Sequence, residues 1–305
     1  MHKSVLLNES IENLNIKENG IYVDCTLGFA GHSKEILKKI KTGKLFAFDQ
    51  DDLAIKLSKE KLEKVNSNFE IINSNFVNIK KELAKRNIKK VDGILFDLGV
   101  SSMQLDIDER GFSFHSNAQL DMRMNQNQEL SAKEVVNTYS KEDIINILYK
   151  YGEEKFAKSI ATNICEERKN KEINTTLELV EIIKKSVPEK YKRKAHPARK
   201  TFQAIRIEVN KELEVFEKAL LDSISLLNKQ GRICVITFHS LEDRICKHTF
   251  KKYSEIDEKV KGLPIIPEQY KPILKIVKKS IKPKENEINE NRRSRSAILR
   301  VVEKI

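Results

Sequence analysis

Cysteine and long apolar runs are both scarce in this sequence. Its four cysteines show neither a paired ladder nor the short C-x-x-C spacing of zinc ligands, so we expect reduced thiols and no metal site. No stretch approaches the roughly 18 apolar residues of a membrane span, and the amino terminus lacks the apolar core and cleavage site of a signal peptide. These absences predict a soluble, cytoplasmic protein that does not enter a membrane.

Length and charge set the next limits. The 305 residues are enough for one large domain and a smaller one. A net charge of +12, with a pI of about 9.3, favours a partner rich in phosphate, because lysine and arginine neutralise phosphates and release counterions. The alternative is that a composition rich in lysine, asparagine and isoleucine reflects the genome and no binding face.

Short apolar runs alternate with amphipathic helical stretches along the chain. This alternation is typical of an α/β fold with a doubly wound, mainly parallel sheet. The run at 91–97 is almost continuously apolar before its final acid, as in a strand buried on both faces. The predicted strands lie at 21–27, 45–50, 69–73, 91–97 and 232–238, with a closing strand at 297–302.

The pattern changes after residue 104. The next hundred residues show helical periodicity and no convincing strand, and a connection of this length is rarely bare loop. We therefore predict an inserted all-helical domain at 105–210 between two parts of one sheet domain, 1–104 and 211–305. Prolines and charges after residue 262 predict an exposed excursion before the closing strand. Helical segments are expected at 141–150, 154–169, 177–185 and 204–228.

A glycine turn follows the first predicted strand, and a carboxylate ends the second. Gly28 and Gly31 precede a helix and Asp49 ends a strand, an arrangement with which doubly wound domains hold an adenosine-bearing cofactor. The third glycine of the dinucleotide-binding turn is absent and Phe29 and Ala30 fill the space, so a cofactor without pyrophosphate fits better. We predict S-adenosylmethionine, with its amino-acid end near the backbone of Gly31 and both ribose hydroxyls donating to Asp49.

Asp49 and two further candidate cofactor contacts, His32 and Phe76, also have a purely structural interpretation. Asp49 could cap the next turn. His32, directly after Gly31, is as suited to capping its helix as to touching the ligand. Phe76, at the end of the third strand, could lie against an adenine ring or in the core.

Asp97 ends the fourth predicted strand, at the sheet edge where open α/β folds bind ligands. An acceptor there would draw on the N–H of an exocyclic amine and localise its lone pair, a role for Asp97 or for a carbonyl of the turn Leu98–Ser101. No aromatic residue follows directly, so Phe112, Phe114 or Phe238 would have to stack on a base. No cysteine stands in the proline-cysteine setting of carbon-5 methylation, so an amine acceptor is favoured over a carbon one.

Six motifs in one order along the whole chain carry a family resemblance. They are DLGVSSMQLD at 97–106, RGFSF at 110–114, LDMRM at 120–124, HPARKTFQAIR at 196–206, FHSLEDR at 238–244 and RSRSA at 293–297. With these motifs the chain resembles the bacterial ribosomal RNA small subunit methyltransferase H family, also called MraW.

This resemblance implies methyl transfer from S-adenosylmethionine to N4 of a cytidine in the 16S rRNA of the small subunit, near the decoding site. It implies the class I S-adenosylmethionine-dependent methyltransferase fold, with a helical insertion that helps to recognise RNA. Among the implied cofactor contacts, only Gln104 adds to the residues discussed above. The full implied set is Ala30, Gly31, His32, Asp49, Phe76, Asp97 and Gln104.

Substrate contacts are expected from basic residues of the same motifs. His196 and Arg199 would touch an RNA phosphate or the target base, and further candidates are Arg123, Arg206 and Arg244. The alternative for each is an ion pair with an acid on a neighbouring helix. Arg292, Arg293 and Arg295 would contact phosphate, although a solvated tail would have the same sequence.

Other functions and several details stay open. A non-catalytic RNA-binding or ribosome-assembly factor could keep the cofactor fold as a vestige, and a nicotinamide oxidoreductase is disfavoured by the missing glycine. The proton of the methylated amine could pass to Asp97 or to water. The sequence also leaves open whether the partner is free rRNA or an assembled subunit, whether a metal ion assists RNA binding, and whether the protein is a homodimer.

Overall fold

The computed structural model describes residues 4–193 and 196–305, apart from the side chains of residues 102 and 103. The chain forms two compact units: the first comprises the residues up to Gly99 together with Leu213–Ile305, and the second comprises Val100–Glu212. No described helix is both long and apolar enough to cross a membrane.

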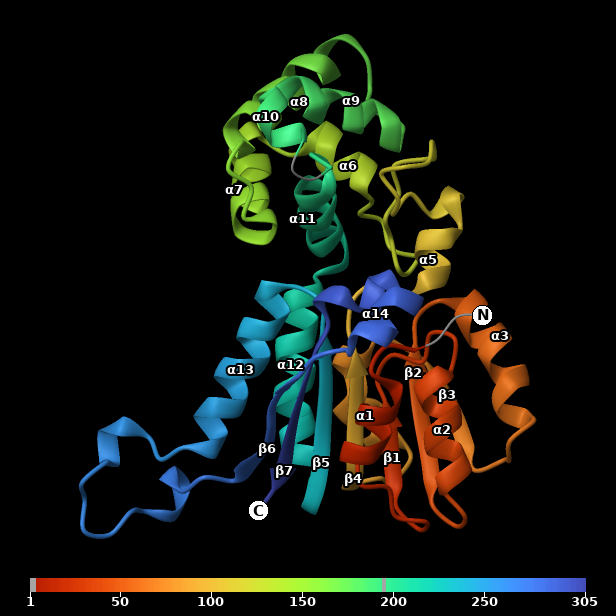
Figure 1. The fold of residues 1–305 in the computed structure, drawn as a ribbon, viewed down its shortest axis with the longest axis vertical. Helices are drawn as coiled ribbons and strands as arrows, with labels where there is room; N and C mark the ends of the chain where they lie inside the picture. The colour runs from red at the N-terminus through yellow and green to blue at the C-terminus, as the bar shows by residue number, and fades with distance from the viewer. Residues whose placement is uncertain (1–3, 194–195) are drawn as a thin grey trace. The chain divides into compact units, whose positions relative to one another are not determined.

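The first unit is built on one seven-stranded sheet with strand order β3-β2-β1-β4-β5-β7-β6 (Figure 1). Strands β1 to β5 are parallel, and β7 is antiparallel to both β5 and β6. This sheet confirms the predicted fold class. The strands are β1 Ile21–Asp24, β2 Lys44–Asp49, β3 Phe69–Asn73, β4 Val91–Asp97, β5 Leu227–Thr237, β6 Leu274–Ile281 and β7 Ile298–Lys304.

Strand β6 lies inside the segment for which the sequence predicts only an exposed excursion. Three of its eight residues are the exposed lysines Lys275, Lys278 and Lys279. Lysine is common on edge strands because it discourages pairing with other chains, and it also hides the apolar alternation on which strand prediction depends.

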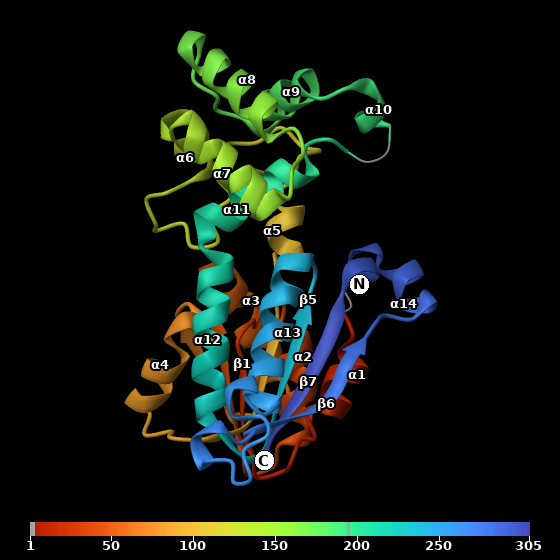
Figure 2. The ribbon, with the colours of Figure 1, turned by 90° about the vertical axis from the view of Figure 1, so that its left-hand side faces the viewer.

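Helices cover both faces of the sheet, as Figures 1 and 2 show. Alternate residues of each central strand point to opposite faces, so Phe46 and Phe96 join one core while Leu45 and Leu95 join the other. Helices α4, α12 and α13 pack on the first face, and α1, α2 and α3 on the second. The helices of this unit are α1 Leu7–Asn13, α2 Gly31–Lys39, α3 Asp52–Glu63, α4 Ile79–Lys85, α12 Glu212–Leu226, whose first residue belongs to the second unit, α13 Ser240–Ser254 and α14 Glu285–Glu290.

The second unit is helical, with one isolated antiparallel bridge between Gln119 and Thr175 among its described residues. Ser131 and Thr175 begin α6 and α9 with capping boxes, in which each side chain and a glutamate three residues later satisfy the free N–H groups. The helices are α5 Ser102–Asp106, α6 Ala132–Thr138, α7 Lys141–Gly152, α8 Ala157–Asn170, α9 Thr176–Ser186, α10 Glu189–Lys192 and α11 Arg199–Asn210.

The periodicity at 204–228 corresponds to two helices and the start of a strand, and not to one helix. Lys211 separates α11 from α12 with a left-handed φ of 50°, and β5 begins at Leu227. A single non-glycine residue in this conformation leaves no gap in an apolar pattern, because the spacing of three and four continues across it. The break is therefore invisible to periodicity.

Candidate active site

Three aspartates end neighbouring parallel strands at one edge of the sheet. Asp24 ends β1, Asp49 ends β2 and Asp97 ends β4, and β1 pairs with both other strands. The carboxyl ends of parallel strands meet at one edge, which is where open α/β sheets bind ligands. This edge gathers two of the predicted cofactor contacts and adds a third acid, Asp24, at which no role was predicted.

The turn between β1 and α2 fits closely against the rest of the unit. Gly28 and Ala30 have positive φ angles of 47° and 61°, a conformation that is uncommon for alanine. A Cβ atom at Gly31 would lie 1.8 Å from Ser4 Oγ. A larger residue at Gly31 would therefore displace the Ser4 side chain. The turn ends at the helix terminus, whose first N–H groups have no acceptor within the helix.

Asp49 attaches this turn to β2. Its Oδ2 accepts from Gly28 N at 2.9 Å, and its Oδ1 accepts from Gln50 N at 2.8 Å and Asp51 N at 3.0 Å. Burial raises the pKa of Asp49 to about 6, in spite of these N–H groups, which lower it. A carboxylate has about four acceptor positions, so about one remains for a ribose hydroxyl. The predicted contact with both hydroxyls would need a shared position.

Asp97 faces His32 across the same edge. Its Oδ2 lies 3.6 Å from His32 Nδ1, which is too long for a hydrogen bond, while its buried Oδ1 has no hydrogen-bond partner among the described residues. Burial, together with the negative charges of Asp24 and Glu242, raises the pKa of Asp97 well above its ordinary value. Asp97 is therefore a strong proton acceptor with an unsatisfied oxygen.

The His32 side chain does not cap its helix, which is one of its two predicted roles. Its ring is buried, with Nε2 3.1 Å from the carbonyl oxygen of Val5 and Nδ1 toward Asp97, and the helix has no side-chain cap. Burial lowers the pKa of His32, which favours a neutral ring that donates to Val5 and leaves Nδ1 as an acceptor. A cofactor contact at this position would come from the backbone N–H.

Asp24 positions Asp97 through Thr26. Asp24 is fully buried, and its Oδ1 accepts from Thr26 N at 3.0 Å, while Thr26 Oγ1 accepts from Asp97 N at 2.8 Å. Its Oδ2 accepts from Ser33 Oγ at 2.7 Å, which ties the strand end to α2. The sequence predicts the first strand over 21–27, which places Asp24 inside it, whereas the observed strand ends at Asp24. With the correct strand end, the rule that identified Asp49 and Asp97 would also have identified Asp24.

Glu242 is the second acid that the sequence did not single out. Its Oε2 accepts from Phe238 N at 2.8 Å and from His239 N at 3.3 Å, at the start of α13. It is almost fully buried, and its charge acts on Asp97. The spacing His239-x-x-Glu242 after a strand is a capping signature that could have indicated this role.

Phe76 and Gln104 have structural partners. Phe76 packs edge-on against Phe96, with ring centroids 5.7 Å apart, at the border of the core. Gln104 is buried in the second unit, where its Oε1 accepts from Ser101 N at 3.1 Å. The amide oxygen of Gln104 thus caps the turn that follows β4.

Two of the candidate RNA-binding arginines form ion pairs with acids of the protein. Arg123 pairs with Asp121 through Nε at 2.8 Å and Nη2 at 2.9 Å, and Arg206 pairs with Glu212 through two contacts of 2.8 Å. These bidentate pairs match the ion-pair alternative. Of the remaining candidates, Arg199 is exposed at the start of α11 and Arg244 is exposed on α13, and the His196 ring stacks on the ring of Phe114 with centroids 4.5 Å apart.

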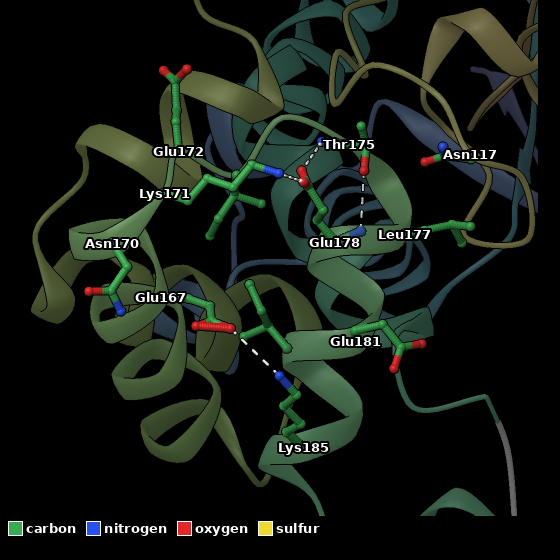
Figure 3. A pocket seen from close by; sticks show the side chains of 12 residues that line it. Asn117, Glu167, Asn170, Lys171, Glu172, Thr175, Leu177, Glu178, Glu181 and Lys185 are labelled. Carbon is green, nitrogen blue, oxygen red and sulfur yellow. Dashed lines mark hydrogen bonds and ion pairs between the residues drawn. The ribbon is translucent and has the colours of Figure 1, made fainter.

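The helical unit also contains a cleft of about 550 Å³ beside α8 and α9, shown in Figure 3. Its charged side chains are largely paired, with Lys171 Nζ 2.6 Å from Glu178 Oε1 and Lys185 Nζ 3.6 Å from Glu167 Oε1. None of the predicted site residues lines it. The predicted cofactor and substrate residues therefore lie elsewhere in the molecule.

Comparison with known proteins identifies the family. The model of the MraW methylase family matches residues 1–305. The chain belongs to the MraW methylase family. It is 55% identical over 307 residues to the Ribosomal RNA small subunit methyltransferase H of Finegoldia magna, covering 100% of this chain and 98% of that protein. The protein of the same name from Exiguobacterium sibiricum is 56% identical over 306 residues, with coverage of 100% and 98%.

Membership of this methylase family makes S-adenosylmethionine the cofactor and the fold that of a class I methyltransferase. The residues at the sheet edge fit this cofactor. Its sulfonium and ammonium groups are positive, and Asp97 offers a buried carboxylate oxygen without a hydrogen-bond partner in the described part of the chain. Its carboxylate suits the free N–H groups at the start of α2, where the helix dipole is positive.

Proposed function

We propose that this protein transfers a methyl group from S-adenosylmethionine to N4 of a cytidine in 16S rRNA, near the decoding site. The observation that carries the proposal is Asp97, an acid of raised pKa with an unpaired oxygen at the carboxyl edge of the sheet. The relatives named Ribosomal RNA small subunit methyltransferase H support rRNA as the substrate class. Because ribosomal subunits assemble in the cytoplasm, we place the reaction there, on an assembled or late-assembling subunit.

The proposed cofactor site uses the turn at Ala30, Gly31 and the backbone of His32 for the amino-acid end, and Asp49 for the ribose. Phe76 and Gln104 remain proposed cofactor contacts. When bound, S-adenosylmethionine supplies a methyl group on a sulfonium, so the leaving group needs no acid. The protein then contributes mainly positioning and the exclusion of water.

Asp97 is the proposed catalytic residue. Its carboxylate accepts a hydrogen bond from the exocyclic N4–H, which localises the nitrogen lone pair, and it or a water takes the proton once the new C–N bond has formed. Thr26 fixes its backbone, and Asp24 and Glu242 raise its affinity for a proton. To meet this group the cytosine must leave its base stack.

The cysteines support an amine acceptor over ring carbon 5. Attack on that carbon requires a thiolate nucleophile, whereas burial raises the pKa of Cys25 and Cys246 well above the ordinary value and that of Cys234 to about 12. A neutral, buried thiol is a poor nucleophile. None of these three cysteines can therefore readily perform that chemistry.

The test is to incubate the protein with tritiated S-adenosylmethionine and small ribosomal subunits and to analyse the digested rRNA by nucleoside mass spectrometry. N4-methylcytidine in the 16S rRNA is expected. The matched control is Asp222→Asn, which removes a carboxylate on α12 that makes no ion pair or hydrogen bond with another described residue, and it should act like the wild type. Label on protein or DNA alone, or a methylated ring carbon, would overturn the proposal.

A further inference from the structure

The segment between β6 and β7 returns the chain to the edge that holds Asp97. Ile281, the last residue of β6, pairs with Leu299 near the start of β7, and Ile298 pairs with Thr237 at the end of β5. Ile236 of β5 in turn pairs with Asp97. Since neighbouring strands lie about 5 Å apart, Ile298 is about 10 Å from Asp97. Residues 282–297 therefore begin and end beside the candidate active site.

This segment is anchored and is not a solvated tail. It contains α14 and the 3-10 turn η5, Arg292–Ser296. Ser294 is fully buried and its Oγ donates to Asn291 O at 2.8 Å, and Ala297 is buried where β7 begins. The side chain of Glu287 in α14 accepts a hydrogen bond from Leu6 N at 2.7 Å, so this segment is bound to a residue near the other end of the chain. The tail alternative for this arginine-rich stretch is therefore wrong.

The anchored turn presents two arginines together. Arg292 and Arg295 are exposed, and they are three residues apart, so in a 3-10 turn their side chains project from the same side. Neither makes an ion pair or side-chain hydrogen bond with a described residue. Lys282 and Lys284, in the approach to α14, are also exposed. These four exposed basic side chains thus lie in this segment, together with the glutamates of α14, Glu285, Glu287 and Glu290.

We propose that Arg292 and Arg295 bind the phosphate backbone of the RNA strand next to the target nucleotide. Guanidinium matches phosphate with two parallel hydrogen bonds, which suits it to hold a strand in a fixed place. Phosphate contacts set the position of a nucleic acid without reading its sequence. This inference rests on the proposed function, because it takes an RNA strand to be the substrate at Asp97, and it makes these arginines positioning residues.

The test compares charge-neutralised variants in binding to small ribosomal subunits, measured at several salt concentrations. The double variant Arg292→Gln/Arg295→Gln should bind about tenfold more weakly. Its slope of log K against log salt should fall by about 1.4 to 1.8, the value for two lost phosphate contacts. Affinity for S-adenosylmethionine, measured by calorimetry, should stay within about twofold, since neither arginine contacts a residue of the cofactor site.

The matched control is Lys64→Gln/Lys89→Gln. These exposed lysines precede β3 and β4, at the opposite edge of the sheet. Their substitution removes the same amount of positive charge as the arginine variant. Subunit affinity and salt slope should match the wild type in this control. An equal loss in both variants, or no loss in the arginine variant, would overturn the inference; the latter would leave an acidic protein surface as the alternative partner.

The arginine inference and the proposed function fail separately. Binding is measured without methyl transfer, so wild-type protein that binds subunits through these arginines but forms no N4-methylcytidine would contradict only the proposed reaction. Wild-type protein that does not bind subunits would contradict the arginine inference. The variant Arg292→Lys/Arg295→Lys keeps the charge without the bidentate geometry, and it should recover part of the affinity and most of the salt slope.

Discussion

Acidification should weaken cofactor binding through Asp49. With a pKa of about 6 in the free protein, this carboxyl is almost fully ionised at about pH 7.5 and about nine-tenths protonated at about pH 5. A ribose hydroxyl donates to the ionised form, so affinity is present above the pKa and is lost as the pH falls through it. If only the ionised form binds, the Kd for S-adenosylmethionine rises about tenfold over this range.

The same pKa shift acts on folding in the opposite direction. Because the native pKa lies above the unfolded value of 3.8, the stability contributed by Asp49 is complete below the unfolded value and is lost as the pH rises through about 6. Between the unfolded and the native pKa of Asp49, this contribution to the unfolding free energy falls by about 3 kcal/mol. Weaker binding at low pH therefore cannot be ascribed to a fold loosened at this residue.

Calorimetric titration with S-adenosylmethionine at both pH values measures the effect, with circular dichroism to confirm that the protein stays folded. Asp97 also titrates, so the contribution of Asp49 is read from a difference: the pH dependence of the wild type should exceed that of Asp49→Asn by about tenfold. Asp222→Asn should keep the full dependence. Equal pH dependence in the wild type and Asp49→Asn would refute the role of Asp49 as a ribose acceptor.

Three further substitutions have defined outcomes. Asp97→Asn should lower methyl transfer to less than about a tenth of wild type in a filter assay while cofactor-free protein stays folded, and higher activity would remove Asp97 from its catalytic role. Gly111→Ala should lower the unfolding free energy measured in urea by more than about 2 kcal/mol, because Gly111 has a φ of 69° and a Cβ there would lie 2.3 Å from Gln119 O. Gly262 has a φ of 100° but a Cβ there would have no atom within 4 Å, so Gly262→Ala should lower the unfolding free energy clearly less. Equal losses in the two variants would contradict the steric argument. Phe216→Ala, at a side chain that is 1% exposed, should cost about 3–5 kcal/mol, and a loss below about 1 kcal/mol would contradict its place in the core.

The sequence predicts the sheet well because each buried strand is a short apolar run that ends in a polar residue. Val91–Asp97 was predicted with its observed bounds, since burial on both faces leaves little other than apolar residues. Edge strands lack this signal, and β6 was missed for that reason. The break at Lys211 was missed because one left-handed residue does not alter the apolar spacing.

The partners of individual side chains are harder to predict from the sequence than the ends of strands. The sequence places Asp49 and Asp97 at one edge, because parallel strands share their direction. It cannot show that His32 turns inward to Val5, 27 residues away, or that Arg206 pairs with Glu212 across the end of a helix. Such contacts depend on the packed fold and on rotamers, and not on local pattern.

The most direct test of the account is a crystal structure of the protein soaked with S-adenosylmethionine. We predict ligand density at the carboxyl edge of β1, β2 and β4, with the amino-acid end at the turn that contains Gly31, the ribose beside Asp49 and the sulfonium end toward Asp97. Density elsewhere, for example in the cleft beside α8 and α9, with this edge left empty, would contradict the assignment of the active site.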